Sequence, residues 1–191
     1  MALTELSPNQ CLLVSMDLQP SLIKVLHHSE RLIYQVSGLI QTAIQLKIPC
    51  WLTEQVPEKL GSTIEAIQSR LSGEQIRIFQ KSAFGLCADS AINDALQQLE
   101  PERRQILLTG AESHICIRQS ALQLKRQGFQ PWVVVDAISS RCEKEHHWAV
   151  QAFLSEKIPI ISTESLLFEW LQTADHPQFK AVQAFIKGKE W

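Results

Sequence analysis

Three side chains in the sequence have the chemistry of a nucleophilic enzyme: the thiol of Cys116, the carboxyl group of Asp17 and the amine of Lys81. A free thiol has a pKa of about 8.5, so it is mostly protonated at neutral pH, and only the thiolate is a strong nucleophile. A lysine ammonium and a helix N-terminus beside the thiol both lower its pKa. Asp17 can accept the thiol proton and later return a proton to a leaving group. If the three residues meet, they predict a hydrolase that attacks its substrate with a cysteine.

The elements that must position these residues alternate between apolar strands and amphipathic helices. Short apolar runs indicate buried strands, and apolar residues recurring every three or four positions indicate helices. The expected strands are residues 11–17, 50–53, 76–79, 106–109, 131–136 and 159–162. The expected helices are residues 30–46, 90–99, 114–127, 143–154, 163–171 and 177–187. This alternation predicts an α/β fold with three layers, in which helices cover both faces of a mostly parallel, Rossmann-like six-stranded sheet.

The three reactive residues stand where such a fold binds ligands, beyond the carboxyl ends of parallel strands. Asp17 ends the first expected strand, Lys81 lies just past the third, and Cys116 follows the fourth at the beginning of a helix. These ends meet at one edge of the sheet, so the residues are expected to converge. Backbone N–H groups between Gly110 and Cys116 can bind the oxyanion that forms on an attacked carbonyl, and losing one such donor typically costs about 3 to 4 kcal/mol.

The composition argues against several other classes of protein. The 191 residues fit one domain, expected to span residues 1–191, and an apolar fraction of 45% supplies a core without disulfides or metals. A formal net charge of −2 argues against nucleic-acid binding, which needs clustered Lys and Arg. The apolar runs are too short for a signal peptide or a membrane span, so we expect a cytoplasmic protein without membrane contact. Five cysteines without a Cys-x-x-Cys pair disfavour a zinc ribbon or a redox pair.

Four short motifs contain or follow these residues and extend along nearly the whole chain. They are residues 14–19 (VSMDLQ), 80–84 (QKSAF), 110–116 (GAESHIC) and 135–141 (VDAISSR). In this order they resemble the motifs of the isochorismatase-like cysteine hydrolases. Residues 53–55 (TEQ) and 176–180 (HPQFK) are similar to the subgroup of isochorismatase domain-containing proteins.

This resemblance implies a role for each residue of the three. Cys116 would be the nucleophile, Asp17 the proton acceptor and Lys81 the group that tunes both. Members of the family carry a non-proline cis peptide, which would fall between Ala111 and Glu112, and the amides of Glu112 and Cys116 would form the oxyanion hole. The expected substrate is a small molecule with an amide, ester or related C–N or C–O bond. Cleavage would proceed through a thioester-type intermediate, and the scheme requires no cofactor.

Differences between this sequence and other members of the family limit the reactions that we expect it to catalyse. Nicotinamidases of this superfamily bind a metal through an Asp-x-His pair and a further His after the second strand, whereas residues 53–70 contain neither Asp nor His. No metal site is therefore expected, and the pairs His27-His28 and His146-His147 are interpreted as solvated helix faces. Enzymes that cleave the vinyl ether of isochorismate do not depend on a cysteine, so Cys116 argues against isochorismate as the substrate.

Residues beside the motifs receive less specific interpretations. Gln55, Phe84 and His114 are predicted to contact the substrate, although packing explains Phe84 and helix capping explains His114 equally well. Arg141 and Asp136 are expected to form an ion pair or a cap near the following helix.

A homo-oligomer is expected by analogy, because members of the family assemble into dimers, tetramers or larger rings. The two terminal helices carry aromatic residues that offer apolar surface for subunit contact. These residues are Phe168, Trp170, Phe179 and Phe185.

Two alternatives to the hydrolase remain open. A catalytically degenerate scaffold for binding or assembly predicts no product and no labelling of Cys116 by a carbonyl electrophile. A redox-responsive thiol protein predicts that peroxide oxidises Cys116 faster than a free thiol, without turnover of amides.

Overall fold

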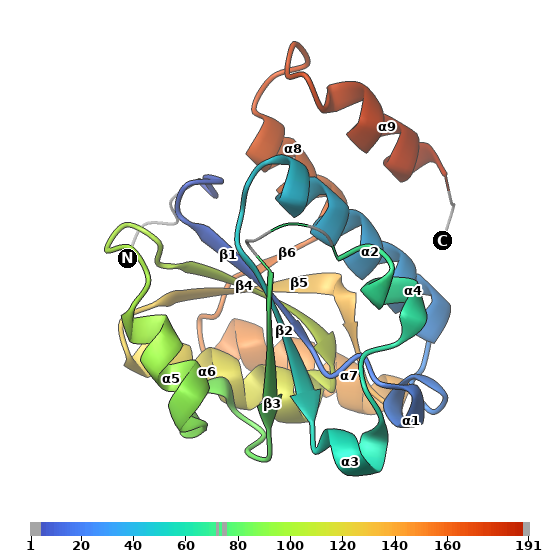
Figure 1. Cartoon of the computed structure of the whole chain (residues 1–191), viewed down its shortest axis with the longest axis vertical. Helices are drawn as coiled ribbons and strands as arrows, with labels where there is room; N and C mark the ends of the chain where they lie inside the picture. Colours follow the sequence, from blue (N-terminus) through green and yellow to red (C-terminus); the bar gives the residue numbers. More distant parts are fainter. Residues whose placement is uncertain (1–4, 72, 74–75, 189–191) are drawn as a thin grey trace.

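A six-stranded sheet lies at the centre of the protein. The computed structural model describes residues 5–71, 73 and 76–188. Every strand pairing is parallel, and the strand order is β3-β2-β1-β4-β5-β6. The strands are β1 (Cys11–Met16), β2 (Cys50–Gln55), β3 (Ile76–Lys81), β4 (Gln105–Ala111), β5 (Gln130–Ser139) and β6 (Ile160–Ile161). The predicted parallel sheet is confirmed, with β1 and β4 as its central strands (Figure 1).

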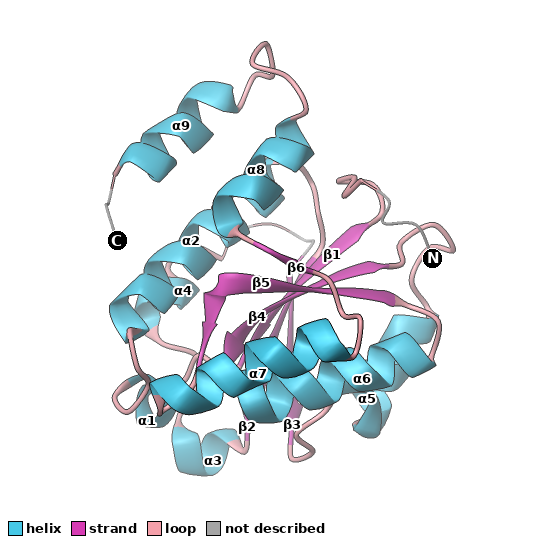
Figure 2. Cartoon of the chain, turned by 180° about the vertical axis from the view of Figure 1, so that it is seen from behind, coloured by secondary structure: helices cyan, strands magenta, loops and turns pink. Residues whose placement is uncertain are grey.

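Helices cover both faces of this sheet (Figures 1 and 2). On one face lie α2 (Ser29–Gln45), α4 (Glu65–Gln68) and α8 (Thr163–Leu171), with α9 (Phe179–Lys187) packed on α2 and α8. On the other lie α5 (Ser90–Gln97), α6 (Arg118–Arg126) and α7 (Glu143–Ser155). Shorter turns are α1 (Pro20–Ile23), α3 (Pro57–Leu60), the 3-10 turn Leu86–Ala88 and the π-helical turn Ser113–Ile117. The three-layer prediction is therefore confirmed.

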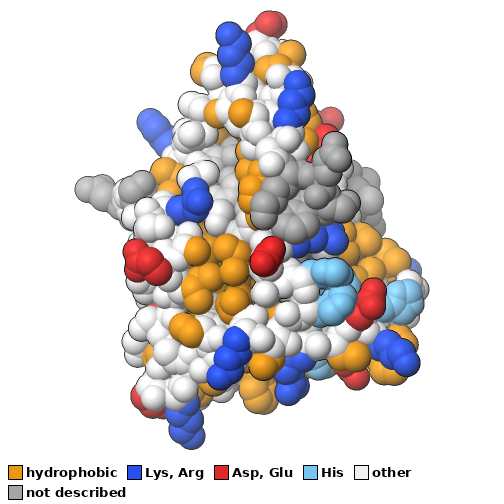
Figure 3. Space-filling view, turned by 90° about the vertical axis from the view of Figure 1, so that its right-hand side faces the viewer, with side chains coloured by type: hydrophobic (Ala, Val, Ile, Leu, Met, Phe, Trp, Pro, Cys, Tyr) orange, Lys and Arg blue, Asp and Glu red, His pale blue; other side chains and the backbone are white. Residues whose placement is uncertain are grey.

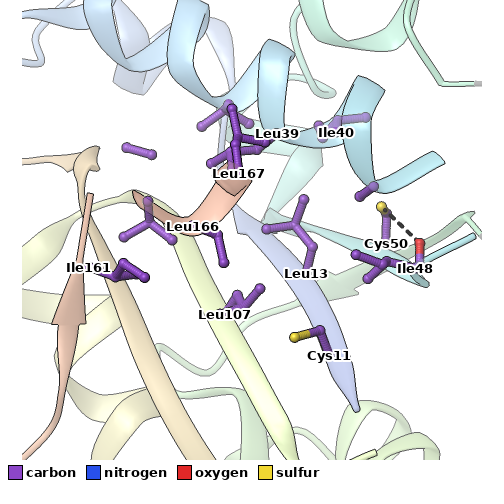
Figure 4. Packing of buried hydrophobic residues seen from close by; sticks show 14 of the residues in the cluster. Cys11, Leu13, Leu39, Ile40, Ile48, Cys50, Leu107, Ile161, Leu166 and Leu167 are labelled. Atoms are coloured by element: carbon purple, nitrogen blue, oxygen red, sulfur yellow. Dashed lines mark hydrogen bonds between the residues drawn. The ribbon is translucent and has the colours of Figure 1, made fainter. Parts of the chain in front are cut away.

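The apolar strands hold the layers together because successive side chains point to opposite faces of the sheet. In β1, Leu13 packs with the cluster under α2 and α8, whereas Leu12 and Val14 pack with the cluster under the helices of the opposite face. Figure 4 shows Leu13 and Leu107 of the sheet facing Leu39 and Ile40 of α2 and Leu166 and Leu167 of α8. Burial on both faces explains why the central strands read as continuous apolar runs.

The structure changes the predicted boundaries at the edge that matters for function. β2 and β3 continue to Gln55 and Lys81, so both residues lie within strands. The helix expected at residues 114–127 instead consists of a π-helical turn followed by α6. In that turn the amide of Ile117 donates to the carbonyl of Glu112 at 3.2 Å, five residues back. Among the described residues no helix has the length and apolar character needed to cross a membrane.

The terminal aromatic residues mostly pack within the chain, contrary to the prediction that they form a subunit surface. Trp170 is buried in the core, and Phe185 stacks on Tyr34 with 4.7 Å between ring centroids. Phe179 packs against the same core cluster. Only Phe168 of the four predicted residues remains exposed, because α9 folds back onto α2 and α8.

Candidate active site

Asp17, Lys81 and Cys116 meet beyond the carboxyl ends of β1, β3 and β4. The Nζ atom of Lys81 lies 2.8 Å from Oδ2 of Asp17, and both side chains are completely buried. The Cys116 thiol forms a side-chain hydrogen bond with Asp17, which raises the thiol pKa. The structure thus brings together the three residues that the sequence singled out, and we refer to them as the Cys-Asp-Lys cluster.

Asp17 owes its position to the two strands beside β1. Its backbone has a positive φ of 58°, a left-handed conformation that Asp adopts more readily than most residues. Its amide donates to the carbonyl of Thr53 at 2.9 Å, and the Thr53 hydroxyl donates to Oδ1 of Asp17 at 2.6 Å. On the other side, a Cβ at Gly110 would lie 2.1 Å from the carbonyl oxygen of Met16. Only glycine permits this close approach of β4 to the end of β1.

Lys81 has a hydrogen-bond acceptor for each of its three N–H bonds. Besides Asp17, its Nζ donates to Oε1 of Gln55 at 2.5 Å and to the carbonyl of Ala83 at 3.3 Å. A buried ammonium needs such partners, because burying an uncompensated charge is costly. The register places Gln55 directly beside Lys81 in the sheet. The lysine is therefore held in place by its neighbours beside Asp17.

Gln55 acts as a positioning residue in this structure. Its side-chain carboxamide accepts a hydrogen bond from Lys81 and donates one to the carbonyl of Ser82 at 2.7 Å. Its backbone N–H donates to Oε1 of Gln19 at 2.7 Å. The side chain of Gln19 in turn donates to the carbonyls of Gln55 and Gly61. Substrate contact by Gln55 stays a prediction.

The resting Cys116 thiol has a raised pKa, so the predicted lowering is wrong for this state. The pKa rises from 9.0 to about 12, first because of burial and then because of the negative charge of Asp17. Lys81 and a backbone hydrogen bond from Glu112 lower it, but by less. The sulfur therefore starts as a protonated thiol. Cys116 is 7% exposed, so a small part of its surface remains accessible.

The peptide between Ala111 and Glu112, five residues before Cys116, is cis. The Glu112 amide faces the Cys116 sulfur, with which it forms the backbone hydrogen bond just described. The Glu112 carboxylate accepts from the amide of Arg141 at 3.1 Å and from its Nε at 2.9 Å. The expected pairing of Arg141 is thus present, and its partner belongs to the turn that carries the cysteine.

Ser113 and His114, the next two residues of this turn, also form hydrogen bonds with residues that follow β5. The Ser113 hydroxyl lies 3.1 Å from Nδ1 of His146, and Nδ1 of His114 lies 3.0 Å from the Ser140 hydroxyl. His114 is thus held by a hydrogen bond, and its contact with substrate stays a prediction.

Asp136, the other residue expected to pair or cap, holds the start of α8. One of its oxygens accepts from the amide of Thr163 at 2.7 Å and from its hydroxyl at 2.9 Å. Asp136 thus makes a capping contact, but at α8 and not at the helix that follows it in sequence, α7.

One cavity adjoins Lys81 at the ends of β2 and β3, but neither Asp17 nor Cys116 lines it, and the Lys81 side chain itself is completely buried. The volume of this cavity is about 270 Å³, and its walls come from the ends of β2 and β3, the start of α3 and Asp89. Phe84 is 52% exposed and is not part of the wall of this cavity. Contact between Phe84 and a substrate stays a prediction.

The interpretation of the histidine pairs as solvated helix faces holds for His147, which is exposed on α7, but not for the other three histidines. His27 and His28 lie in the turn before α2, with ring centroids 3.8 Å apart, and share a pocket with His146 of α7. Tertiary packing brings the pairs together although they are far apart in sequence. Within the described ranges, no group of three or more His, Cys, Asp and Glu residues is arranged to hold a metal ion.

Sequence reasoning missed the supporting roles of Thr53 and Gln19. Both lie in motifs quoted above, Asp-x-Gln at 17–19 and Thr-Glu-Gln at 53–55, so the signal was present. What the motifs do not reveal is the register, which sets Thr53 beside Met16 at the end of β1.

Fold and site together define a three-layer α/β protein with a buried polar cluster at the carboxyl edge of its sheet. A family model described as the isochorismatase domain matches residues 11–165, which is most of the chain. The chain belongs to the isochorismatase family, and its fold is that of the hydrolases of this family.

Known proteins similar to this chain agree with that assignment. Isochorismatase family protein 1A of Dictyostelium discoideum is 30% identical and aligns over 93% of this chain and 86% of its own length. Isochorismatase domain-containing protein 1 of Danio rerio is 32% identical over 97% of this chain, which spans 64% of the fish protein. A solved structure described as the MAR1 ribonuclease of Caenorhabditis elegans has a TM-score of 0.88, 29% identity, and coverage of 96% and 93% of the two chains.

Proposed function

We propose that this protein is a cysteine-dependent hydrolase that cleaves a small amide, ester or related C–N or C–O bond. Cys116 is the nucleophile, Asp17 the general base and acid, and Lys81 the cation that pairs with Asp17. The observation that carries this proposal is the meeting of thiol, carboxylate and ammonium in one buried cluster. Such a cluster is costly to bury, so a role in catalysis accounts for its presence.

In the proposed first step, the Asp17 carboxylate takes the thiol proton as the sulfur attacks the substrate carbonyl carbon. The carbonyl π electrons move to oxygen, and the amides of Glu112 and Cys116 bind this oxyanion. When the intermediate collapses, the C–N or C–O bond breaks and Asp17 passes its proton to the leaving group. The acyl group is then joined to Cys116 as a thioester.

In the second step, water replaces the leaving group. Asp17 removes a proton from the water as its oxygen attacks the thioester carbon, and the C–S bond then breaks. The sulfur leaves with the proton held by Asp17, which restores the thiol and releases a carboxylic acid. The high resting pKa of the thiol fits this scheme, because proton transfer to Asp17 accompanies attack and needs no stored thiolate.

Mass spectrometry of the protein during turnover of a panel of small amides and esters tests the proposal. Wild type and the matched control Cys142→Ala, which removes an exposed cysteine, should gain an acyl mass on Cys116. Cys116→Ala should gain no adduct and lose turnover by at least about a thousandfold. Full turnover by Cys116→Ala on a confirmed substrate would show that the mechanism is wrong.

The same experiment separates the two alternatives. A scaffold would give neither product nor adduct with any compound of the panel. A redox-responsive protein requires a reactive thiolate, which the raised thiol pKa disfavours. Oxidation of Cys116 by peroxide should therefore be slower than oxidation of a free thiol.

A small molecule is also better supported than RNA as the substrate of this protein. The ribonuclease activity in the description of the C. elegans structure is stated of that protein. The net charge of −2 supports a small substrate over RNA here. Incubation with RNA, with Cys116→Ala as control, should give no cysteine-dependent cleavage.

Assembly and location complete the proposal. We propose a homo-oligomer, supported by the exposed Trp148 of α7 and by Phe84, which are 59% and 52% exposed. Light scattering should give a mass above that of one chain. A cytoplasmic location also stays a proposal, since the similar Isc1 protein of Phytophthora sojae is named a secreted effector. Fractionation of the producing cells tests it.

A further inference from the structure

A second pocket, separate from the Cys-Asp-Lys cluster, lies between the turn before α2, the end of β5 and the start of α7. Its volume is about 250 Å³. Its charged and titratable walls are His27, His28, Arg31, Asp136, Glu143 and His146. Figure 3 shows histidine side chains gathered on one part of the surface. We refer to this site as the arginine-histidine pocket.

Arg31 is the residue that makes this pocket unusual. Its guanidinium has no hydrogen bond and no ion pair with any residue that the structure describes, and its Nε is shielded from solvent. Buried polar atoms are nearly always paired. The shielded Nε does not face the open pocket, so the donors that Arg31 offers to a ligand are its terminal N–H groups, which have no partner among the described residues.

The surroundings of Arg31 carry groups of both signs, because the carboxyl groups of Asp136 and Glu143 line the same pocket as Arg31 and the three histidines. The pKa of His146 is lowered first by burial and then by the charges of Arg31, His27 and His147, whereas Glu143 raises it. Asp136 lies in the wall, but it already accepts two hydrogen bonds from Thr163 at the start of α8. Arg31 and the three imidazoles are thus the donors that the pocket offers, and Glu143 is the carboxylate that opposes an anion there.

We propose that the arginine-histidine pocket binds a tetrahedral oxyanion, namely a phosphate group that is free or part of a small ester. A guanidinium binds phosphate through two parallel hydrogen bonds, and an imidazole can add an N–H donor, which for His146 must be Nε2 because its Nδ1 lies 3.1 Å from the Ser113 hydroxyl. Donors that reach the pocket from α7 and from the turn before α2 suit an anion with oxygens on several sides. A planar carboxylate, with two oxygens, uses fewer of them.

Anion binding at this site depends on pH. A bound anion raises the pKa of His146, because it offsets the positive charges of Arg31, His27 and His147, while Glu143 opposes the anion. Protonation of His146 and anion binding then favour each other, so affinity rises as pH falls. If the pKa of His146 rises by one unit on binding, affinity changes by about tenfold.

Nuclear magnetic resonance of the histidine ring protons is the suitable measurement, because the chain has only six histidines. Sulfate is the first probe, since it stays a dianion between pH 5.5 and 8, whereas phosphate esters titrate near pH 6. Sulfate should shift the signals of His27, His28 and His146 saturably, with little effect on His176. Inorganic phosphate and phenyl phosphate then distinguish a free phosphate from an ester, and malonate tests for a carboxylate.

Two variants and one control decide the proposal. Arg31→Gln should weaken sulfate binding at least about tenfold, the loss expected for a charge-assisted hydrogen bond. His28→Asn alters an exposed side chain and should weaken binding by a smaller factor, even if Arg31→Gln folds poorly. Arg126→Gln removes an equal charge from the exposed end of α6 and should leave binding unchanged.

Three results would overturn the assignment. They are no saturable shift at these histidines, equal affinity of Arg31→Gln and wild type, and tighter binding of malonate than of sulfate. Enzyme turnover is not a readout here, so the outcome is independent of the proposed hydrolase activity.

Discussion

The Cys-Asp-Lys cluster and the arginine-histidine pocket lie near the same edge of the sheet, yet their cations differ in how many hydrogen-bond acceptors surround them. Lys81 is completely buried and has three acceptors, whereas Arg31 has none among the described residues. A buried cation whose N–H groups all have acceptors fixes the geometry of its neighbours, as catalysis requires. A cation whose N–H groups lack acceptors leaves a position for a ligand. Stability measurements on matched variants can test this difference directly.

The largest expected effect comes from replacing each cation by a side chain of similar length. Lys81→Met leaves the buried Asp17 carboxylate without its partner and should lower the free energy of unfolding by about 3 to 5 kcal/mol. Arg31→Met breaks no hydrogen bond or ion pair with a described residue and should change it by less than about 0.5 kcal/mol. Urea denaturation followed by circular dichroism measures both. Equal losses for the two variants would contradict the comparison.

Hydrogen bonds within the network should matter next. Thr53→Val keeps the shape of the side chain but removes the donor to Oδ1 of Asp17. An unpaired buried carboxylate oxygen should cost about 1 to 3 kcal/mol of unfolding free energy. The same denaturation experiment measures it. A neutral result would show that the Thr53 hydroxyl does not hold Asp17.

The fold and the cluster were predictable because they depend on local patterns. Apolar runs such as residues 11–16 reveal buried strands, and parallel strands bring Asp17, Lys81 and Cys116 to one edge whatever the loops do. The thiol pKa was not predictable, since burial and the charge of Asp17 outweigh the effects of Lys81 and of the backbone.

The arginine-histidine pocket and the roles of Thr53 and Gln55 also escaped sequence reasoning. They depend on strand register and on the packing of α2 against β5, and neither leaves a periodic signal in the sequence.

A smaller effect concerns pH and the buried thiol. The folded Cys116 has a pKa of about 12 against an ordinary value of 9.0, so above pH 9 the unfolded chain releases this proton and the folded chain keeps it. The thiol therefore stabilises the fold fully below pH 9, and this contribution is lost progressively as pH rises from 9 to about 12. Between pH 8 and pH 10, wild type should lose about 1 kcal/mol more unfolding free energy than Cys116→Ala. Parallel pH profiles of the two proteins would refute the raised pKa, since Cys11 and Cys50 are common to both.

A small loss of stability should come from the exposed ion pair that supports the cysteine turn. Arg141→Gln removes an Nε donor whose side chain is 58% exposed, while the backbone amide of the same residue still binds the Glu112 carboxylate. The loss in unfolding free energy should therefore be about 0.5 kcal/mol. If the Glu112 amide binds the oxyanion as proposed, a looser turn weakens a contact that matters mainly in the transition state. The variant should then lower kcat several-fold and leave KM unchanged. A change in KM alone would assign Arg141 to substrate binding instead of to the position of the turn.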